Sequence, residues 1–323
     1  MPKILHTAKY TGLPLEILQN ACPQGFTVKT LDEATHEQLA KEAADADYFL
    51  VSGRLPIDKA VLDNAPKLKM IQRTGVGTEM LDTEEIKRRN IPVYVNAGVN
   101  ARSVAEHTLT LILACLKRLP QINQQMRQGI WKKQQTGVLT HELYGKTVGL
   151  VGMGHIGQLV ASMLQPFGVK LLYSDIFRQK AETEAALNLT YCEKFEALLP
   201  QCDILSFHCP LTKENTDMLN KHTLSMMKKG AIVINTARGK LINPDDMYDA
   251  LRSGYIGAAG IDTHYEEPVK EGYKLAELDN VILTPHIGGL SYEAFEVMMT
   301  GAMENIKAFE KGNFLEIEGK RIL

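Results

Sequence analysis

The chain has 323 residues, enough for two domains of ordinary size, and its 45% hydrophobic and 23% charged residues are typical of a water-soluble globular protein. Its formal net charge of −2 provides no basic field, so the composition predicts neither a nucleic-acid nor a membrane partner. The N-terminus lacks the apolar core of a signal peptide. The five cysteines form no CxxC pair and no metal-ligand spacing, which predicts reduced thiols, no metal site and a cytoplasmic location.

The first hundred residues alternate short apolar runs with segments of helical spacing. The predicted strands are Lys3–Thr7, Phe26–Leu31, Tyr48–Ser52, Leu68–Arg73 and Pro92–Asn96. The predicted helices between them are Leu15–Ala21, Glu37–Ala44, Asp58–Asn64 and Thr83–Arg89. This alternation predicts a small parallel sheet wound with helices.

The segment that follows predicts a long, largely buried helix. Ser103 and Glu106 match a capping box, which marks a helix start. From Thr108 to Leu119 the helix is apolar nearly all round, so it must be buried on more than one face. A central helix of the monomer and a subunit interface both satisfy this pattern, and we favour both together.

A second series of alternating strands and helices begins near Lys146. Its predicted strands are residues 147–151, 169–174, 203–207, 231–235, 257–262 and 281–284. The predicted fold class is therefore α/β, with two doubly wound parallel-sheet domains in one chain.

A glycine-rich fingerprint joins the first strand of this second series to a helix. Gly152 permits a tight turn, Gly154 lets the backbone approach a pyrophosphate, and Gly157 lets helix and strand pack closely. The helix start offers free N–H groups to the phosphates. Asp175, at the end of the next strand, would accept hydrogen bonds from the ribose hydroxyls and repel a 2′-phosphate. The sequence therefore predicts a dinucleotide site that prefers NAD; Arg178 is the only nearby cation that would favour NADP, and a solvated side chain is its simpler interpretation.

Three reactive side chains follow strands of the second series, where open α/β sheets bind ligands. Arg238 has the fork that grips a carboxylate, His286 belongs to the residue type whose unperturbed pKa lies near working pH, and Glu267 would orient an imidazole by hydrogen bonding. Taken singly, they could be a surface charge, a core or capping histidine, and one of two adjacent acids. Their coincidence at strand ends favours a catalytic site beside a nicotinamide.

With these motifs in order, the chain resembles the D-isomer-specific 2-hydroxyacid dehydrogenases across nearly its whole length. The matching motifs are Gly75-Val76-Gly77, Ser103-Val104-Ala105-Glu106-His107-Thr108, Gly152-Met153-Gly154-His155-Ile156-Gly157, His208-Cys209-Pro210-Leu211-Thr212, Asn235-Thr236-Ala237-Arg238-Gly239, Asp262 with Glu267-Pro268, and Thr284-Pro285-His286-Ile287-Gly288. The resemblance implies that Arg238 binds the substrate carboxylate and polarises the keto group, that His286 is the acid–base group, and that Glu267 is its partner. The implied reaction is NAD-dependent hydride transfer between nicotinamide and C2 of a small D-2-hydroxy acid or 2-keto acid.

The resemblance also implies the binding residues and the domain map. The backbone amides of Val76 and Gly77 would help to bind the substrate carboxylate. Besides the three fingerprint glycines, the implied NAD-binding residues are His155, Ile156, Asp175, Cys209, Pro210, Thr216, Thr236, Ala237 and Asp262, the last near the nicotinamide carboxamide. A Rossmann NAD-binding domain of residues 99–289 would be inserted into a flavodoxin-like substrate domain of residues 1–98 and 290–323. A final helix, Tyr292 to Lys311, would complete that domain with Ala294, Phe295, Val297, Met298 and Ile306 as its apolar face.

Departures from the family pattern leave the particular substrate open. Thr78-Glu79-Met80 replaces an Asp-Asn pair, Asn96-Ala97-Gly98 replaces Thr-Pro-Gly, and Asp262-Thr263-His264 stands where many relatives have Asp-Val-Phe. Either Arg54 or Arg73 could bind a substrate phosphate, or both could be structural, so phosphorylated and plain 2-keto acids remain candidates.

Two further expectations concern partners. The alternative function is a non-enzymatic NAD(H)-sensing partner or co-repressor, which the presence of all three catalytic residues disfavours. We also expect a homodimer built on the dinucleotide domain, through the apolar helix and a helical stretch from Gln121 to Trp131, the only tryptophan. The simpler alternative places Trp131 in the monomer's own core.

Overall fold

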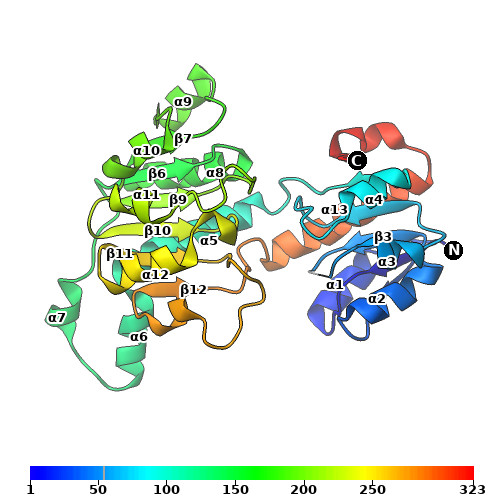
Figure 1. Cartoon of the computed structure of the whole chain (residues 1–323), viewed down its shortest axis with the longest axis horizontal. Coiled ribbons are helices and arrows are strands. Elements are labelled where there is room, and N and C mark those ends of the chain that lie inside the picture. The colour runs from blue at the N-terminus through cyan, green and yellow to red at the C-terminus, as the bar shows by residue number, and fades with distance from the viewer. Residues whose placement is uncertain (54) are drawn as a thin grey trace. The chain divides into compact units, whose positions relative to one another are not determined.

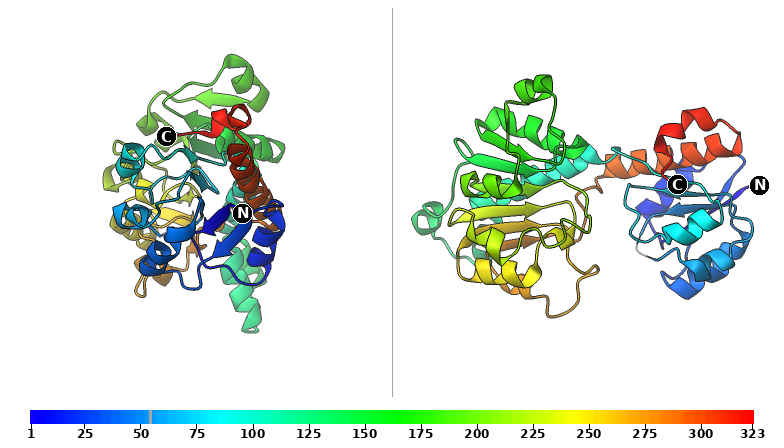
Figure 2. Two further views of the ribbon diagram at one scale, coloured as in Figure 1. Left: turned by 90° about the vertical axis from the view of Figure 1, so that its right-hand side faces the viewer. Right: turned by 45° about the horizontal axis from the view of Figure 1, so that its top comes forward.

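The computed structural model describes residues 1–53 and 55–323, and this part of the chain divides into two compact units. Unit 1 consists of Met1–Asn100 and Ser291–Leu323, and unit 2 consists of Ala101–Leu290. Each unit is built around one sheet whose strands run parallel (Figures 1 and 2). The prediction of two doubly wound α/β units is confirmed.

Unit 1 has the strand order β2-β1-β3-β4-β5, which is that of a flavodoxin-like fold. Its strands are β1 (Lys3–His6), β2 (Thr27–Thr30), β3 (Tyr48–Val51), β4 (Met70–Arg73) and β5 (Val93–Tyr94). Its helices are α1 (Leu13–Ala21), α2 (His36–Glu42), α3 (Lys59–Asp63), α4 (Thr83–Arg88) and α13 (Tyr292–Glu310). Successive side chains of β3 point to opposite faces: Phe49 packs with α2, α3 and α4, and Leu50 packs with α1 and α13.

Helix α13 brings the end of the chain back to unit 1. Ser291 caps its start by accepting the N–H of Ala294, and Met299 and Met303 are fully buried against the sheet. The predicted apolar face needs one correction, because Val297 is 50% exposed and the buried stripe runs through Met298, Met299, Ala302, Met303 and Ile306.

Unit 2 has the strand order β12-β11-β10-β9-β6-β7-β8, which is that of a Rossmann fold (Figure 1). Its strands are β6 (Thr147–Val151), β7 (Lys170–Ser174), β8 (Leu189–Tyr191), β9 (Ile204–Phe207), β10 (Ala231–Asn235), β11 (Ile256–Ile261) and β12 (Val281–Leu283). Its helices are α5 (Ala101–Lys117), α6 (Leu119–Arg127), α7 (Lys133–Gly137), α8 (His155–Leu164), α9 (Ala181–Leu187), α10 (Phe195–Leu198), α11 (Lys221–Ser225) and α12 (Pro244–Arg252). The strand order reverses between β6 and β9, directly beside the glycine-rich loop.

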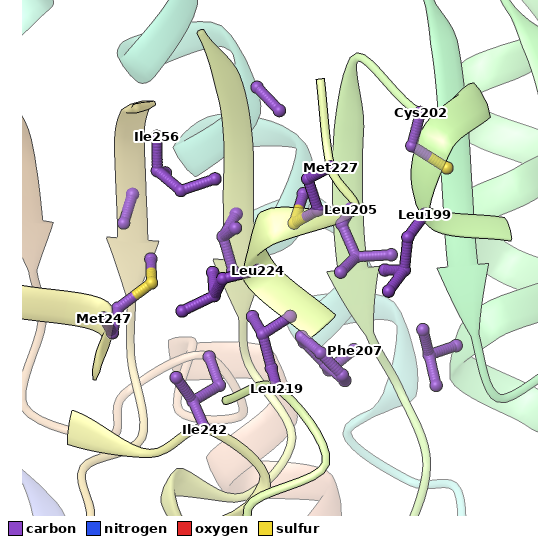
Figure 3. Packing of buried hydrophobic residues seen from close by; sticks show 14 of the residues in the cluster. Leu199, Cys202, Leu205, Phe207, Leu219, Leu224, Met227, Ile242, Met247 and Ile256 are labelled. Atoms are coloured by element: carbon purple, nitrogen blue, oxygen red, sulfur yellow. The ribbon is translucent and has the colours of Figure 1, made fainter. Parts of the chain in front are cut away.

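Both faces of this sheet are covered, which explains the continuous apolar runs of its strands. Leu205 and Phe207 of β9 pack with Leu224 of α11 and Met247 of α12 on one face (Figure 3). Ile204, on the opposite face, belongs to a cluster that includes side chains of α5 and α8.

One strand was missed, and two local predictions were wrong. Strand β8 was not predicted, because it has only three residues and lies at the sheet edge. Helix α5 begins at Ala101, so Ser103 is not a cap; its hydroxyl donates instead to the Gly288 carbonyl, 2.8 Å away. The stretch from Gln121 to Trp131 is not one helix, since α6 ends at Arg127.

Candidate active site

The glycine-rich loop forms a backbone cradle between β6 and α8. Gly152 has φ 96°, and a side-chain carbon there would lie 2.6 Å from the amide nitrogen of Cys209. A side-chain carbon at Gly157 would lie 2.3 Å from the Gly152 carbonyl oxygen. Gly154 caps α8 without a side-chain hydrogen bond, and a carbon added to it would meet nothing within 4 Å. The loop is therefore closed on its protein side and open at the helix N-terminus, a shape that fits a pyrophosphate.

Asp175 follows β7 and lies against this loop. Its Oδ2 accepts the N–H of Met153 at 2.6 Å, and its Oδ1 accepts the N–H of Phe177 at 3.1 Å. Arg178, the nearby cation, makes a two-pronged contact with Glu184, in which Nε and Nη2 each lie 3.0 Å from a carboxylate oxygen. Its guanidinium also stacks over Tyr191, 5.4 Å from the ring centre. The Arg178 charge is thus already held by a protein carboxylate.

The remaining predicted cofactor residues lie on the segments that surround this loop. His155 and Ile156 begin α8. Cys209 and Pro210 follow β9; burial raises the pKa of the Cys209 thiol to about 11, and the Pro210 carbonyl accepts from Asn215 at 2.8 Å. Thr216, in the next turn, is exposed, and its hydroxyl donates to Thr212.

His286 and Glu267 form a hydrogen-bonded pair. His286 Nδ1 lies 2.8 Å from Glu267 Oε2, and the two side chains are 38% and 17% exposed. The other carboxylate oxygen, Oε1, accepts the backbone N–H of His264 at 2.7 Å. His286 has φ 58°, in the left-handed region that residues other than glycine rarely adopt. The structure thus brings together two side chains that lie 19 residues apart in the sequence.

Asp262 organises the turn that carries His286. Its Oδ1 accepts from the Thr284 hydroxyl at 2.6 Å and from the Ile287 N–H at 2.9 Å, and its Oδ2 accepts from the Gly288 N–H at 2.9 Å. Although burial raises the pKa of this carboxyl, the hydrogen bonds that it accepts, the one from His107 foremost, lower it to about 2. Thr284 and His107 had no predicted role, since the motifs that contain them do not reveal this contact.

Arg238 lies in the turn after β10, with Thr236 and Ala237 before it. Its Nη1 donates to the Ala237 carbonyl at 2.8 Å, and the Thr236 hydroxyl is 2.9 Å from that of Thr108 in α5. A side-chain carbon at Gly239 would lie 2.0 Å from the carbonyl carbon of His264. The turn that carries Arg238 therefore packs directly against the segment that holds Glu267.

The predicted substrate-binding amides belong to unit 1. Val76 is exposed, and the Gly77 carbonyl accepts from Arg73 Nε at 2.6 Å. Arg73 Nη1 also donates to the Val51 carbonyl at 3.2 Å. These contacts favour the structural interpretation of Arg73, because its guanidinium holds the loop of Gly77. Arg54 lies outside the described residues.

Comparison with known proteins gives long matches. A sequence profile of the "D-isomer specific 2-hydroxyacid dehydrogenase, NAD binding domain" matches residues 109–288. The glyoxylate reductase of Thermococcus litoralis is 40% identical over 273 residues, which cover 83% of this chain and 81% of that protein. The D-3-phosphoglycerate dehydrogenase of Methanocaldococcus jannaschii is 35% identical over 98% of this chain and 59% of its own length. Among solved structures, D-lactate dehydrogenase from Aquifex aeolicus, complexed with NAD and lactic acid, has a TM-score of 0.83 and 28% identity over 99% of this chain and 98% of that one.

These matches, on a Rossmann unit with a dinucleotide fingerprint, define a nicotinamide-dependent oxidoreductase. The chain belongs to the D-isomer specific 2-hydroxyacid dehydrogenase family. It is an NAD-dependent enzyme that transfers a hydride between nicotinamide and C2 of a small 2-hydroxy acid or 2-keto acid. The alternative of a non-enzymatic NAD(H)-sensing partner is not favoured. In the described residues, no helix has both the length and the apolar character that crossing a bilayer requires.

Proposed function

We propose that His286 is the acid–base group of this reaction, that Glu267 orients it, and that Arg238 binds the substrate carboxylate and polarises the keto group. The observation that carries this proposal is the 2.8 Å contact between His286 Nδ1 and Glu267 Oε2. With Nδ1–H donating to the carboxylate, Nε2 is the ring atom that would exchange a proton with substrate. NAD, when bound, supplies or accepts the hydride. In the reducing direction the C2–O double bond becomes a single bond, C2 gains the hydride, and the oxygen gains the proton from Nε2.

We propose that unit 2 binds NAD and that unit 1 is the substrate domain, with the amides of Val76 and Gly77 assisting Arg238. The pyrophosphate would lie on the cradle of Gly152, Gly154, His155, Ile156 and Gly157. The remaining proposed contacts to NAD are Asp175, Cys209, Pro210, Thr216, Thr236, Ala237 and Asp262. Support comes from the open N-terminus of α8 and from the position of Asp175 beside it.

For the substrate, we propose a plain small 2-keto acid of the glyoxylate class. Relatives named glyoxylate reductase match at 34–40% identity over most of this chain. The engagement of Arg73 with two backbone carbonyls argues against a phosphate-binding role for that side chain.

The acid–base role of His286 and the substrate class can be tested together by measuring NADH oxidation. The substrates compared are glyoxylate, hydroxypyruvate, pyruvate and a phosphorylated 3-carbon 2-keto acid. His286→Ala should lower kcat by about 100- to 10,000-fold, because a positioned acid–base group contributes that much, while NADH binding persists. Near-normal turnover of this variant would refute the assigned role of His286. A kcat/KM that is highest for the phosphorylated acid would refute the substrate class.

We propose a homodimer built through residues 119–139 of unit 2. Large apolar side chains of this segment are solvent-exposed in the single chain; they are Leu119, Met126, Ile130, Trp131, Val138 and Leu139. Trp131 is 75% exposed, so it does not fill the core of its own subunit. Light scattering at micromolar concentration should give about twice 35.9 kDa, the mass of one chain. A mass near that of one chain, or an unchanged mass for Trp131→Lys with Met126→Lys, would contradict the proposed interface.

We further infer a cytoplasmic enzyme without a nucleic-acid partner. Support comes from the five cysteines, all of which are free, and from the net charge of −2. Fractionation of the native host would test the location, and a gel-shift assay would test the nucleic-acid expectation.

A further inference from the structure

His264 is buried between the turn after β11 and the turn after β12. Its side chain is 8% exposed. Nε2 lies 2.9 Å from the Thr284 carbonyl oxygen, and Nδ1 lies 3.1 Å from the Tyr273 hydroxyl. A carbonyl can only accept, so Nε2 carries a hydrogen, and in the neutral ring Nδ1 accepts from the Tyr273 O–H. Burial, together with the nearby Glu267, raises the pKa of Tyr273 to about 12, which keeps that donor protonated.

The same residue touches both halves of the Glu267–His286 pair. Its backbone N–H donates to Glu267 Oε1 at 2.7 Å. The Thr284 carbonyl, which accepts from its ring, also accepts the backbone N–H of His286 at 3.0 Å. One histidine therefore connects the carboxylate that orients the imidazole with the backbone turn that carries the imidazole.

The turn at His286 needs such support. A non-glycine residue at φ 58° adopts a rarely populated conformation, which persists only when surrounding contacts determine it. Asp262 fixes the residues after His286 by accepting the backbone N–H groups of Ile287 and Gly288. His264 fixes the residues before His286 by donating from Nε2 to the Thr284 carbonyl.

We propose that His264, together with Tyr273, is a positioning residue that fixes the geometry of the Glu267–His286 pair. This inference rests on the proposed acid–base role of His286. A phenyl ring at position 264 would fill similar volume without an N–H for the Thr284 carbonyl. A role limited to packing therefore predicts that phenylalanine is tolerated, whereas a positioning role predicts a loss of turnover.

The experiment measures kcat and KM for glyoxylate and the Kd of NADH in His264→Phe, His264→Gln and Tyr273→Phe. We expect His264→Phe to lower kcat by about tenfold, because it removes the hydrogen bonds made by the ring, while KM and the Kd of NADH change less than about twofold. His264→Gln should recover part of kcat, because its amide N–H can donate to the Thr284 carbonyl. Tyr273→Phe should lower kcat by about threefold, because it removes one of the two contacts.

Tyr255→Phe is the matched control. In the wild-type protein the Tyr255 hydroxyl also donates to backbone carbonyls, those of Ser225 and Met227. These residues lie far along the chain from His264. This variant should lose stability without losing kcat.

The variant His286→Ala separates a failure of the acid–base role of His286 from a failure of the positioning role of His264. If it keeps near-normal turnover, both the acid–base role and the positioning role fail. If it loses turnover while His264→Phe stays within twofold of wild-type kcat, only the positioning role is overturned. If His264→Phe does not fold, Tyr273→Phe decides: a threefold loss of kcat with unchanged NADH binding supports the proposal, and wild-type kcat overturns it.

Discussion

Acidification should destabilise unit 1 through His6, the last residue of β1. The imidazole is fully buried. Nε2 is hydrogen-bonded to the Ser52 hydroxyl, Nδ1 lies 3.5 Å from the Thr30 hydroxyl, and the ring packs 4.2 Å from that of Tyr10. Burial, only partly offset by the Ala8 backbone, lowers the pKa of His6 from 6.5 to about 4.

The size of the effect follows from this difference in pKa. Between pH 6.5 and 4, the unfolded chain binds a proton at this residue that the folded chain does not bind, so the free energy of unfolding falls as the pH falls. At about pH 5 the loss attributable to His6 is about 2 kcal/mol relative to about pH 7.5. Below pH 4 the folded state is protonated as well, and the loss levels off at about 3 kcal/mol.

Native-state hydrogen exchange of β1 and β3 peptides measures this loss in unit 1 alone, after correction for the intrinsic pH dependence of exchange. The matched variant is His6→Gln, which keeps polar groups at the site but does not titrate in this range. Its opening free energy should fall by about 2 kcal/mol less than that of the wild type between the two pH values. Equal pH dependence in the two proteins would show that acid destabilises unit 1 through groups other than His6.

Three further predictions concern unit 2. Gly152→Ala should raise the Kd of NADH more than about tenfold in a fluorescence titration. The reason is that the added carbon would lie 2.6 Å from the Cys209 amide nitrogen, at a φ that favours glycine. Wild-type affinity of this variant for NADH would contradict the proposed cradle. Glu184→Gln should raise kcat/KM with NADPH by about threefold to tenfold at unchanged kcat/KM with NADH, because it frees Arg178 to pair with a 2′-phosphate; unchanged use of NADPH would count against this. Asp262→Asn should lower kcat by about tenfold in steady-state assays, because the amide cannot accept every hydrogen bond that the carboxylate accepts; full activity would show that the turn holds without it.

The fold could be predicted because its strands are apolar runs separated by helices of clear periodicity. Strand β8 escaped prediction because Leu189-Thr190-Tyr191 is short and has an exposed centre. The start of α5 was misplaced because Ser103 satisfies the spacing of a cap, yet its hydroxyl is used by Gly288 in a distant segment. Local patterns therefore failed where a contact distant in sequence replaced the local one.

At the candidate site, the contact between Glu267 and His286 could be predicted, but most other contacts could not. Arg73 could equally bind a phosphate or hold a loop until the structure showed two backbone carbonyls on its guanidinium. Arg178 was expected to be solvated and its side chain is exposed, but its ion pair with Glu184 on α9 was not predicted. Asp262 matches a position that the family resemblance relates to the nicotinamide, yet both of its oxygens accept hydrogen bonds from the protein.

The register between β11 and β12 explains why Asp262 and Thr284 lie beside one another. Ala259 pairs with Val281, and Ile261 pairs with Leu283. One step beyond the strands, this offset sets Asp262 level with Thr284, whose side chains are hydrogen-bonded 2.6 Å apart. Because strands covered on both faces have no polar–apolar alternation, the sequence does not specify this register. A one-residue slip would separate Asp262 from Thr284, so the catalytic geometry depends on a strand pairing that only the folded sheet reveals.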